Sequence, residues 1–149
     1  MAAVVRKIGL DQVRSLTEKM KAFENASAFV KVNIDHCVKV YSHFINSGMG
    51  AMFALMDGNE IIGGLGCIKA PDLHEGVMTA IECFWLVLPE HRGQGLKLFR
   101  AFERWAAENK CEKKAMIHMA DSFPEMLTKF YEREGYQLAE LHYVKGVRS

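Results

Sequence analysis

One stretch of the sequence decides the fold, VLPEHRGQGL at residues 87–96. It overlaps the end of a nearly continuous apolar run, Ile81 to Leu88, whose β-branched and aromatic residues are typical of a central strand covered on both faces. After it, apolar residues recur at helical spacing from Leu98 to Ala106, which predicts a helix that starts near Gln94. The stretch therefore joins a buried strand to an amphipathic helix.

The two glycines of this turn predict an anion site at the helix N-terminus. Gly93 and Gly95 lack a Cβ, so the backbone can approach a ligand closely, and the unpaired N–H groups of the first helical turn point at it. Arg92 and Lys97 place cations at a helix start, which is unfavourable unless an anion is bound. This charge pattern favours a phosphate ligand over a purely structural strand-to-helix turn.

Two other glycine-containing phosphate motifs do not fit. A P-loop ends in Gly-Lys-Ser/Thr, but Lys97 is followed by Leu98, which has no hydroxyl for magnesium. The segment Gly64-Leu65-Gly66 starts like a dinucleotide fingerprint, but Lys69 occupies the third glycine position and no helix pattern follows. A nucleotide-binding regulator is therefore disfavoured.

The stretch resembles motif A of the GCN5-related N-acetyltransferases, the GNAT superfamily, whose pattern after a strand is Val-x-Pro-x-x-Arg-Gly-x-Gly-x-Gly/Ala. Every fixed position matches up to Gly95, and the sequence departs at Lys97, where the family usually has Gly or Ala. A second segment, Phe130 to Tyr136, resembles the family's Leu-Tyr-Glu-x-x-Gly-Phe signature. The resemblance covers residues 48–140 well and the N-terminal third only by pattern.

The resemblance implies one α/β domain over residues 1–149, with a mixed central β-sheet flanked by about four helices. The residue patterns predict the same order of elements. Strand patterns cover residues 3–8, 51–56, 60–69, 81–88, 115–120 and 136–144, and helix patterns cover 11–23, 33–48, 94–109 and 123–133. Asp11 and either Asn33 or Asp35 are candidate helix caps. Only fourteen residues follow Gly135, so the family's C-terminal hairpin is either shortened or completed by a partner chain in a homodimer.

The activity implied by the resemblance is transfer of an acetyl group from acetyl-coenzyme A to an amine. In relatives, motif A binds the pyrophosphate through backbone N–H groups, the preceding strand pairs with the pantetheine arm, and an Asn further along contacts that arm. The corresponding cofactor-binding positions are Leu86, Val87, Arg92, Gly93, Gln94, Gly95, Leu96, Lys97 and Ser122. Ser122 replaces the usual Asn. The Lys97 side chain could clash with the cofactor, pair with a phosphate, or lie solvated on the outer helix face.

Tyr131 occupies the position of the family's tyrosine acid. A phenol has a pKa near 10, so it is protonated at pH 7 and can donate to a departing thiolate. Packing of the helix end is its alternative role. A non-catalytic acyl-coenzyme A binding module would not need a hydroxyl group at this position. The presence of Tyr131 therefore favours an enzyme.

Two residues compete for the role of base. Glu82 is the ionisable residue within the apolar strand, where burial would raise its pKa. It lies an odd number of residues from Val87, whereas the base of relatives lies an even number away, so a β-bulge would be needed to bring it to the same face. His118 stands where ribosomal-protein N-acetyltransferases carry a Glu, and imidazole titrates near neutral pH. Purely structural roles, an ion pair for Glu82 and a core hydrogen bond for His118, stay equally open.

Composition limits the class of protein. Lys and Arg total 19 against 18 Asp and Glu, so the net charge is +1 and no nucleic-acid partner is expected. The four cysteines form no C-x-x-C pair and are expected to be reduced thiols, and no metal site is predicted. No window is long and apolar enough for a membrane span, and a cytoplasmic location is the expectation. The acceptor amine, on a small molecule or a protein, is not identified by the sequence.

Overall fold

The computed structural model describes residues 2–24 and 27–146. The chain divides into two compact units, Met1–Ile117 and His118–Ser149. Among the described residues, the first unit contains a five-stranded sheet and three α-helices, and the second contains one α-helix. In chain order the elements are β1 (Val4–Lys7), the 3₁₀ helix η1 (Leu10–Gln12), α1 (Val13–Lys21), α2 (Ile34–Asn46), β2 (Gly50–Asp57), β3 (Glu60–Pro71), β4 (Met78–Val87), the 3₁₀ helix η3 (Pro89–His91), α3 (Leu96–Glu108), β5 (Lys113–Ala115) and α4 (Pro124–Arg133).

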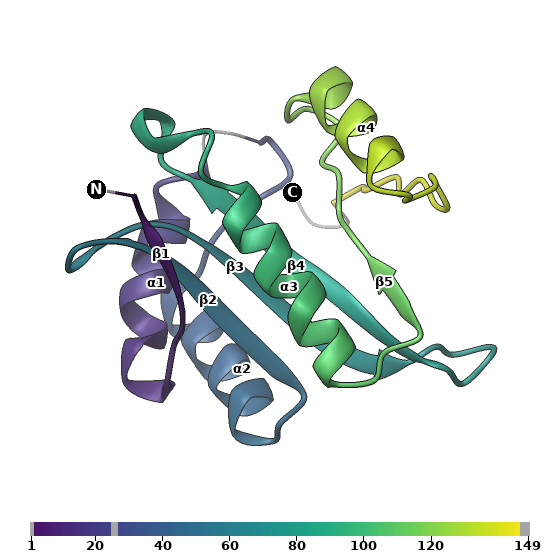
Figure 1. The fold of residues 1–149 in the computed structure, drawn as a ribbon, viewed down its shortest axis with the longest axis horizontal. Helices are drawn as coiled ribbons and strands as arrows, with labels where there is room; N and C mark the ends of the chain where they lie inside the picture. The colour runs from purple at the N-terminus through teal and green to yellow at the C-terminus, as the bar shows by residue number, and fades with distance from the viewer. Residues whose placement is uncertain (1, 25–26, 147–149) are drawn as a thin grey trace. The chain divides into compact units, whose positions relative to one another are not determined.

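The sheet has the order β1-β2-β3-β4-β5 and is mixed, as the sequence predicts. Strands β1 to β4 pair antiparallel with their neighbours, and β5 pairs parallel to β4. Helices α1 and α2 cover one face of the sheet and α3 covers the other (Figure 1). This arrangement confirms the predicted fold class.

Alternation along β2 builds both halves of the core. Phe53 and Leu55 pack on the α3 side, whereas Met52 and Met56 pack on the side of α1 and α2. Successive side chains of a strand point to opposite faces, so a strand that is buried on both faces needs apolar residues at nearly every position. This requirement explains the continuous apolar run from Ala51 in the sequence.

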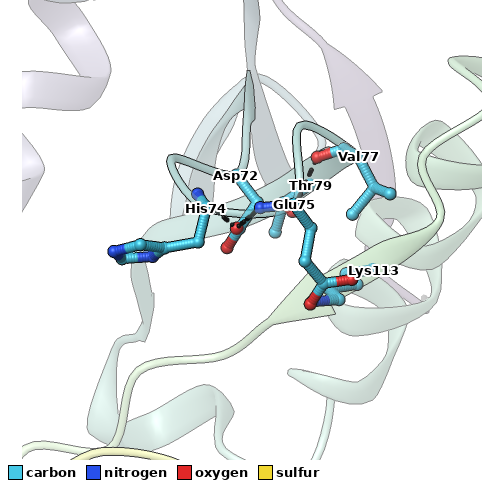
Figure 2. A network of polar contacts seen from close by, with 6 residues as sticks. All are labelled: Asp72, His74, Glu75, Val77, Thr79 and Lys113. Atoms are coloured by element: carbon cyan, nitrogen blue, oxygen red, sulfur yellow. Dashed lines mark hydrogen bonds and ion pairs between the residues drawn. The ribbon is translucent and has the colours of Figure 1, made fainter.

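The turn between β3 and β4 is held by polar contacts (Figure 2). One oxygen of Asp72 accepts hydrogen bonds from the backbone N–H groups of His74 and Glu75, each at 2.8 Å, and these bonds lower the pKa of Asp72. The Glu75 carboxylate forms an ion pair with Lys113, the first residue of β5. The turn therefore ties the far end of the β3–β4 hairpin to the start of β5.

The helix predictions hold, with differences at their ends. The side chain of Asn33 caps α2 by accepting a hydrogen bond from the backbone N–H of His36 at 3.0 Å. Asp11 does not cap α1, because it lies within η1 and α1 begins two residues later. In the second unit, α4 begins at Pro124, whose fixed φ suits the first helical position.

Two predicted strands differ from the structure. The strand predicted at residues 115–120 lies instead at Lys113–Ala115. Beyond its end, the backbone N–H of Ile117 donates to the side chain of Glu82. The strand predicted at 136–144 does not form in the described residues. Its apolar side chains are exposed, with Leu138 at 82% and Tyr143 at 94%. Alternating apolar residues do not make a strand without a neighbouring strand to pair with.

Candidate active site

The start of α3 presents unpaired backbone donors. The helix begins at Leu96, and its N-cap residue Gly95 offers no side-chain hydrogen bond to the first turn. Within the described part of the chain, no protein group accepts from the N–H groups of Gly93, Gly95 and Leu96. The other amides predicted to face the cofactor bond to carbonyl oxygens inside the turn, namely those of Arg92, Gln94 and Lys97. Three free donors within four residues at a helix N-terminus suit a bound phosphate.

The backbone of the turn requires a glycine at residue 93 and leaves little room beside residue 95. Gly93 has a φ of 102°, in the left-handed region that side chains disfavour. Gly95 lies against β4, where an added Cβ would stand 3.1 Å from Cγ2 of Val87. The indole N–H of Trp85 donates to the carbonyl oxygen of Gly95 at 3.2 Å. Strand β4 therefore fixes where the helix starts.

Lys97 takes a position that the sequence did not predict. Its Nζ donates to the carbonyl oxygen of Ala3 at 2.7 Å and to Oε1 of Gln94 at 3.3 Å. The same Gln94 oxygen accepts from the backbone N–H of Ala3 at 3.0 Å. Lys97 and Gln94 thus connect the first turn of α3 to Ala3, the residue before β1. The Lys97 side chain therefore points toward the start of the chain.

The edge of β4 beyond Ile81 is open to a ligand. Its pairing with β5 runs only from Thr79 to Ile81, and no strand of the described residues pairs with Leu86 and Val87 on that side. An extended chain that carries amide groups, such as pantetheine, can pair with an unpaired strand edge. The residues present therefore fit the coenzyme arm expected from the sequence.

The β-bulge required for Glu82 is present. Across β3 and β4, Glu82 pairs with Cys67 and Phe84 pairs with Gly66, so that Cys83 is the extra residue of the bulge. The shift places Glu82 on the α3 face of the sheet, the face of Cys67 and Val87. Without the extra residue, alternation would turn the carboxyl to the opposite face.

Glu82 is a buried acid, with 3% of its surface exposed. Burial raises the pKa of its carboxyl to about 8, and the hydrogen bond from the backbone N–H of Ile117 opposes that rise. A carboxyl group with a pKa near neutral can accept a proton from an ammonium ion at physiological pH.

The second unit gathers aromatic rings around Tyr131. This residue lies on α4 and is buried, and its ring centroid stands 6.2 Å from that of His118, 5.7 Å from Phe130 and 5.9 Å from Tyr136. Nε2 of His118 is buried and has no hydrogen-bond partner in the described residues, which leaves it able to bind a ligand. Ser122 lies half-buried in the turn before α4, where its N–H donates to the carbonyl of Met119 at 3.0 Å.

Sequence analysis missed two residues beside the bulge. Tyr41 of α2 forms a side-chain hydrogen bond with Cys83. The only sequence signal was the position of Tyr41 on the apolar stripe of α2 with Ile34, Val38 and Ile45, which predicts burial but no partner. A contact between residues more than forty positions apart cannot be found from local periodicity.

Comparison with known proteins decides the family. The model of the "Acetyltransferase (GNAT) family" matches residues 13–136. The chain belongs to the GNAT acetyltransferase family. It is therefore an N-acetyltransferase, with acetyl-coenzyme A as its acyl donor. The match runs through both compact units of the chain.

Solved structures share the GNAT fold at low sequence identity. The ribosomal-protein-alanine N-acetyltransferase from Brucella melitensis biovar Abortus 2308 is 16% identical, with a TM-score of 0.73 over 98% of this chain and 99% of that chain. The aminoglycoside N-acetyltransferase AAC(6')-Iy in complex with CoA is 16% identical, with a TM-score of 0.75 over 99% and 95%. An aminoglycoside acetyltransferase from an uncultured soil metagenomic sample is 15% identical, with a TM-score of 0.76 over 99% and 100%.

Two findings complete the comparison. No significant sequence match was found among curated proteins. Of the helices in residues 2–24 and 27–146, none has the length and hydropathy needed to span a bilayer.

Proposed function

We propose that this chain transfers the acetyl group of acetyl-coenzyme A directly to a primary amine on a small molecule or a protein. The observation that carries this proposal is the buried Glu82 carboxyl, set by the β4 bulge beside the open edge of the sheet. The amine nitrogen attacks the thioester carbonyl, the new C–N bond forms and the C–S bond breaks. The base takes a proton from the amine, and the acid gives one to the leaving thiolate.

The coenzyme contacts follow from the free donors. We infer that the turn from Arg92 to Lys97 binds the pyrophosphate, chiefly through the three free N–H groups of Gly93, Gly95 and Leu96. Leu86 and Val87 would pair with the pantetheine, and Ser122 would contact it from the second unit. The helix N-terminus carries roughly half a positive charge, which stabilises a bound phosphate.

Tyr131 is the proposed acid and Glu82 the proposed base. The pKa of about 8 at Glu82 supports this choice, because a base works best when its pKa lies near the operating pH. His118 is the alternative base, supported by its unpartnered Nε2. We further infer that the two units act as one catalytic domain; a homodimer and the absence of nucleic-acid binding stay predictions.

The acceptor screen should start from three amine classes. The similar structures include enzymes described as acting on a ribosomal-protein alanine and on aminoglycosides. Peptides with an N-terminal alanine, aminoglycosides and polyamines should be tested with acetyl-coenzyme A, and thiol release should be followed. We expect release to depend on at least one of these acceptors. Binding of acetyl-coenzyme A without transfer to any of them would instead favour a non-catalytic acyl-coenzyme A binding module.

Variants then separate the two candidate bases. Glu82→Gln and His118→Gln should be compared over a range of pH with an accepted amine, with Glu108→Gln on the exposed side of α3 as control. Only loss of the true base removes the acidic limb of the pH profile of kcat/KM. We expect that limb to be lost in Glu82→Gln. A wild-type profile in Glu82→Gln would assign Glu82 a structural role.

A further inference from the structure

The bulge in β4 needs support from outside the sheet. Its extra residue, Cys83, has no partner across β3, and such an unpaired residue weakens the local ladder. The face on which Glu82 lies depends on this single residue, because a one-residue change of register turns a side chain to the other face. Whatever holds the bulge therefore also sets the position of the carboxyl.

Two contacts from Tyr41 of α2 and one contact within β4 hold the bulge. The side chains of Tyr41 and Cys83 are hydrogen-bonded, and the thiol in turn lies 3.9 Å from the carbonyl oxygen of Ile81. The Tyr41 ring meets the edge of the Phe84 ring, with centroids 5.6 Å apart and planes at 88°. Tyr41 thus contacts both residues that follow Glu82.

A glycine on β3 makes room for this arrangement. An added Cβ on Gly66 would stand only 2.3 Å from the Phe84 ring, so any larger residue there would displace the ring. The Phe84 ring therefore occupies the space beside Gly66, its cross-strand partner, where it contacts Tyr41. The packing of α2 onto the sheet and the path of the bulge depend on each other.

We propose that Tyr41 is a positioning residue, which holds the β4 bulge through Cys83 and Phe84 and so keeps Glu82 on the α3 face of the sheet. The effect of Tyr41 on catalysis rests on the proposed function, in which Glu82 is the base. Its effect on the position of Glu82 does not depend on that function. Tyr41 lies on the opposite face from the carboxyl, so it acts through the backbone of the bulge.

Glu82 can be observed through its hydrogen bond with the backbone N–H of Ile117. The resonance of an amide that donates to a carboxyl group shifts when that group loses its proton. Other titratable groups near Glu82 are Tyr41 of α2, Cys67 of β3 and Cys83. Burial raises the pKa of each of them, to about 11 for Cys83, so all three are neutral where Glu82 titrates.

The test is an NMR titration of the Ile117 amide in the full chain. We expect a midpoint near pH 8 in the wild type and no such titration in Glu82→Gln. Tyr41→Phe and Cys83→Ala should move the midpoint by about one pH unit or abolish the titration, since the carboxyl changes its environment. Cys83→Ser keeps a partner for the Tyr41 hydroxyl and should restore wild-type behaviour. Tyr143→Phe, at a tyrosine that is 94% exposed, is the matched control.

Activity gives a second readout once an acceptor is known. Tyr41→Phe should lower kcat about tenfold to hundredfold, because a base displaced by about 1 Å loses that much. The KM for acetyl-coenzyme A should change little. Because the two side chains share one contact, Tyr41→Phe combined with Cys83→Ala should fall no further than Cys83→Ala alone.

The two proposals fail in different ways. An unchanged Ile117 midpoint in both Tyr41→Phe and Cys83→Ala would overturn the positioning role, even if acetyl transfer is demonstrated. An Ile117 titration that persists in Glu82→Gln would overturn it as well, because another group would then be titrating. A failed acceptor screen would count against the proposed function alone, since the NMR titration needs no acceptor.

Discussion

At the scale of single residues, the position of Glu82 connects fold to chemistry. Its carboxyl is buried, and the one hydrogen bond that the Ile117 amide supplies does not offset the loss of water. Such a group costs stability when it is charged. A buried carboxyl with a raised pKa is typical of a functional site, where the protein accepts that cost for reactivity.

This cost should appear in the pH dependence of stability. The pKa of Glu82 is about 8 in the folded chain against an ordinary value of 4.5, so the folded state binds more protons than the unfolded state between these pH values. The free energy of unfolding from this group therefore falls as pH rises through that window, by about 5 kcal/mol at about 1.4 kcal/mol per pKa unit. Glu82→Gln cannot titrate and should lose this slope.

Urea unfolding at pH 5, 7 and 9 measures this effect. The wild type and the control Glu108→Gln should lose stability toward pH 9 more steeply than Glu82→Gln does. Parallel curves for all three proteins would mean that Glu82 is not an acid with a raised pKa in the folded chain.

Tyr131 carries the second prediction at this scale. Tyr131→Phe keeps the ring that packs against His118 and Tyr136 but removes the proton that a phenol donates. We expect kcat to fall by about 10² to 10⁴, with little change in affinity for the coenzyme. Tyr136→Phe, in the same cluster of rings, serves as control. Equal kcat values for Tyr131→Phe and wild type, with chemistry rate-limiting, would leave Tyr131 as a packing residue.

At the scale of elements, the β4–α3 junction could be predicted from the sequence because the residues that specify it are close together in the chain. The apolar strand, the turn glycines and the helical stripe each lie within a few residues of one another. The bulge was expected only from the parity of Glu82 and Val87, and no local signal identified Cys83 as the extra residue. The contact beyond the end of β5, from Ile117 to Glu82, joins residues 35 positions apart and could not be predicted. Residues 136–144 show that alternation alone does not specify a strand.

A charged substitution tests whether the start of α3 binds the phosphates of the coenzyme. Gly95→Asp places a carboxylate beside the three free N–H groups that we propose bind the pyrophosphate, so it should abolish binding of coenzyme A by calorimetry. Gly95→Ala adds only the Cβ, which would meet the side chain of Val87 at 3.1 Å, and should weaken binding much less. Coenzyme A binding to Gly95→Asp with wild-type affinity would show that the phosphate lies elsewhere.

At the scale of the whole molecule, membership of the GNAT family identifies the reaction but not the acceptor. Structures with this fold at 15–16% identity include enzymes described as acting on a ribosomal-protein alanine and on aminoglycosides. The net charge of +1 gives no strong field that would select a highly acidic or basic acceptor. The sequence holds a motif for the acyl donor but no residue pattern that identifies the acceptor amine.

Binding of acetyl-coenzyme A to the wild-type chain tests the central claim most directly, and a thermal-shift titration with unfolding free energies measures it. A ligand that binds only the folded state at 100 times Kd should stabilise it by about 2.7 kcal/mol. We expect this stabilisation from acetyl-coenzyme A, and we expect it to be lost in Gly95→Asp. No stabilisation by acetyl-coenzyme A, coenzyme A or longer acyl forms at any concentration would contradict the account.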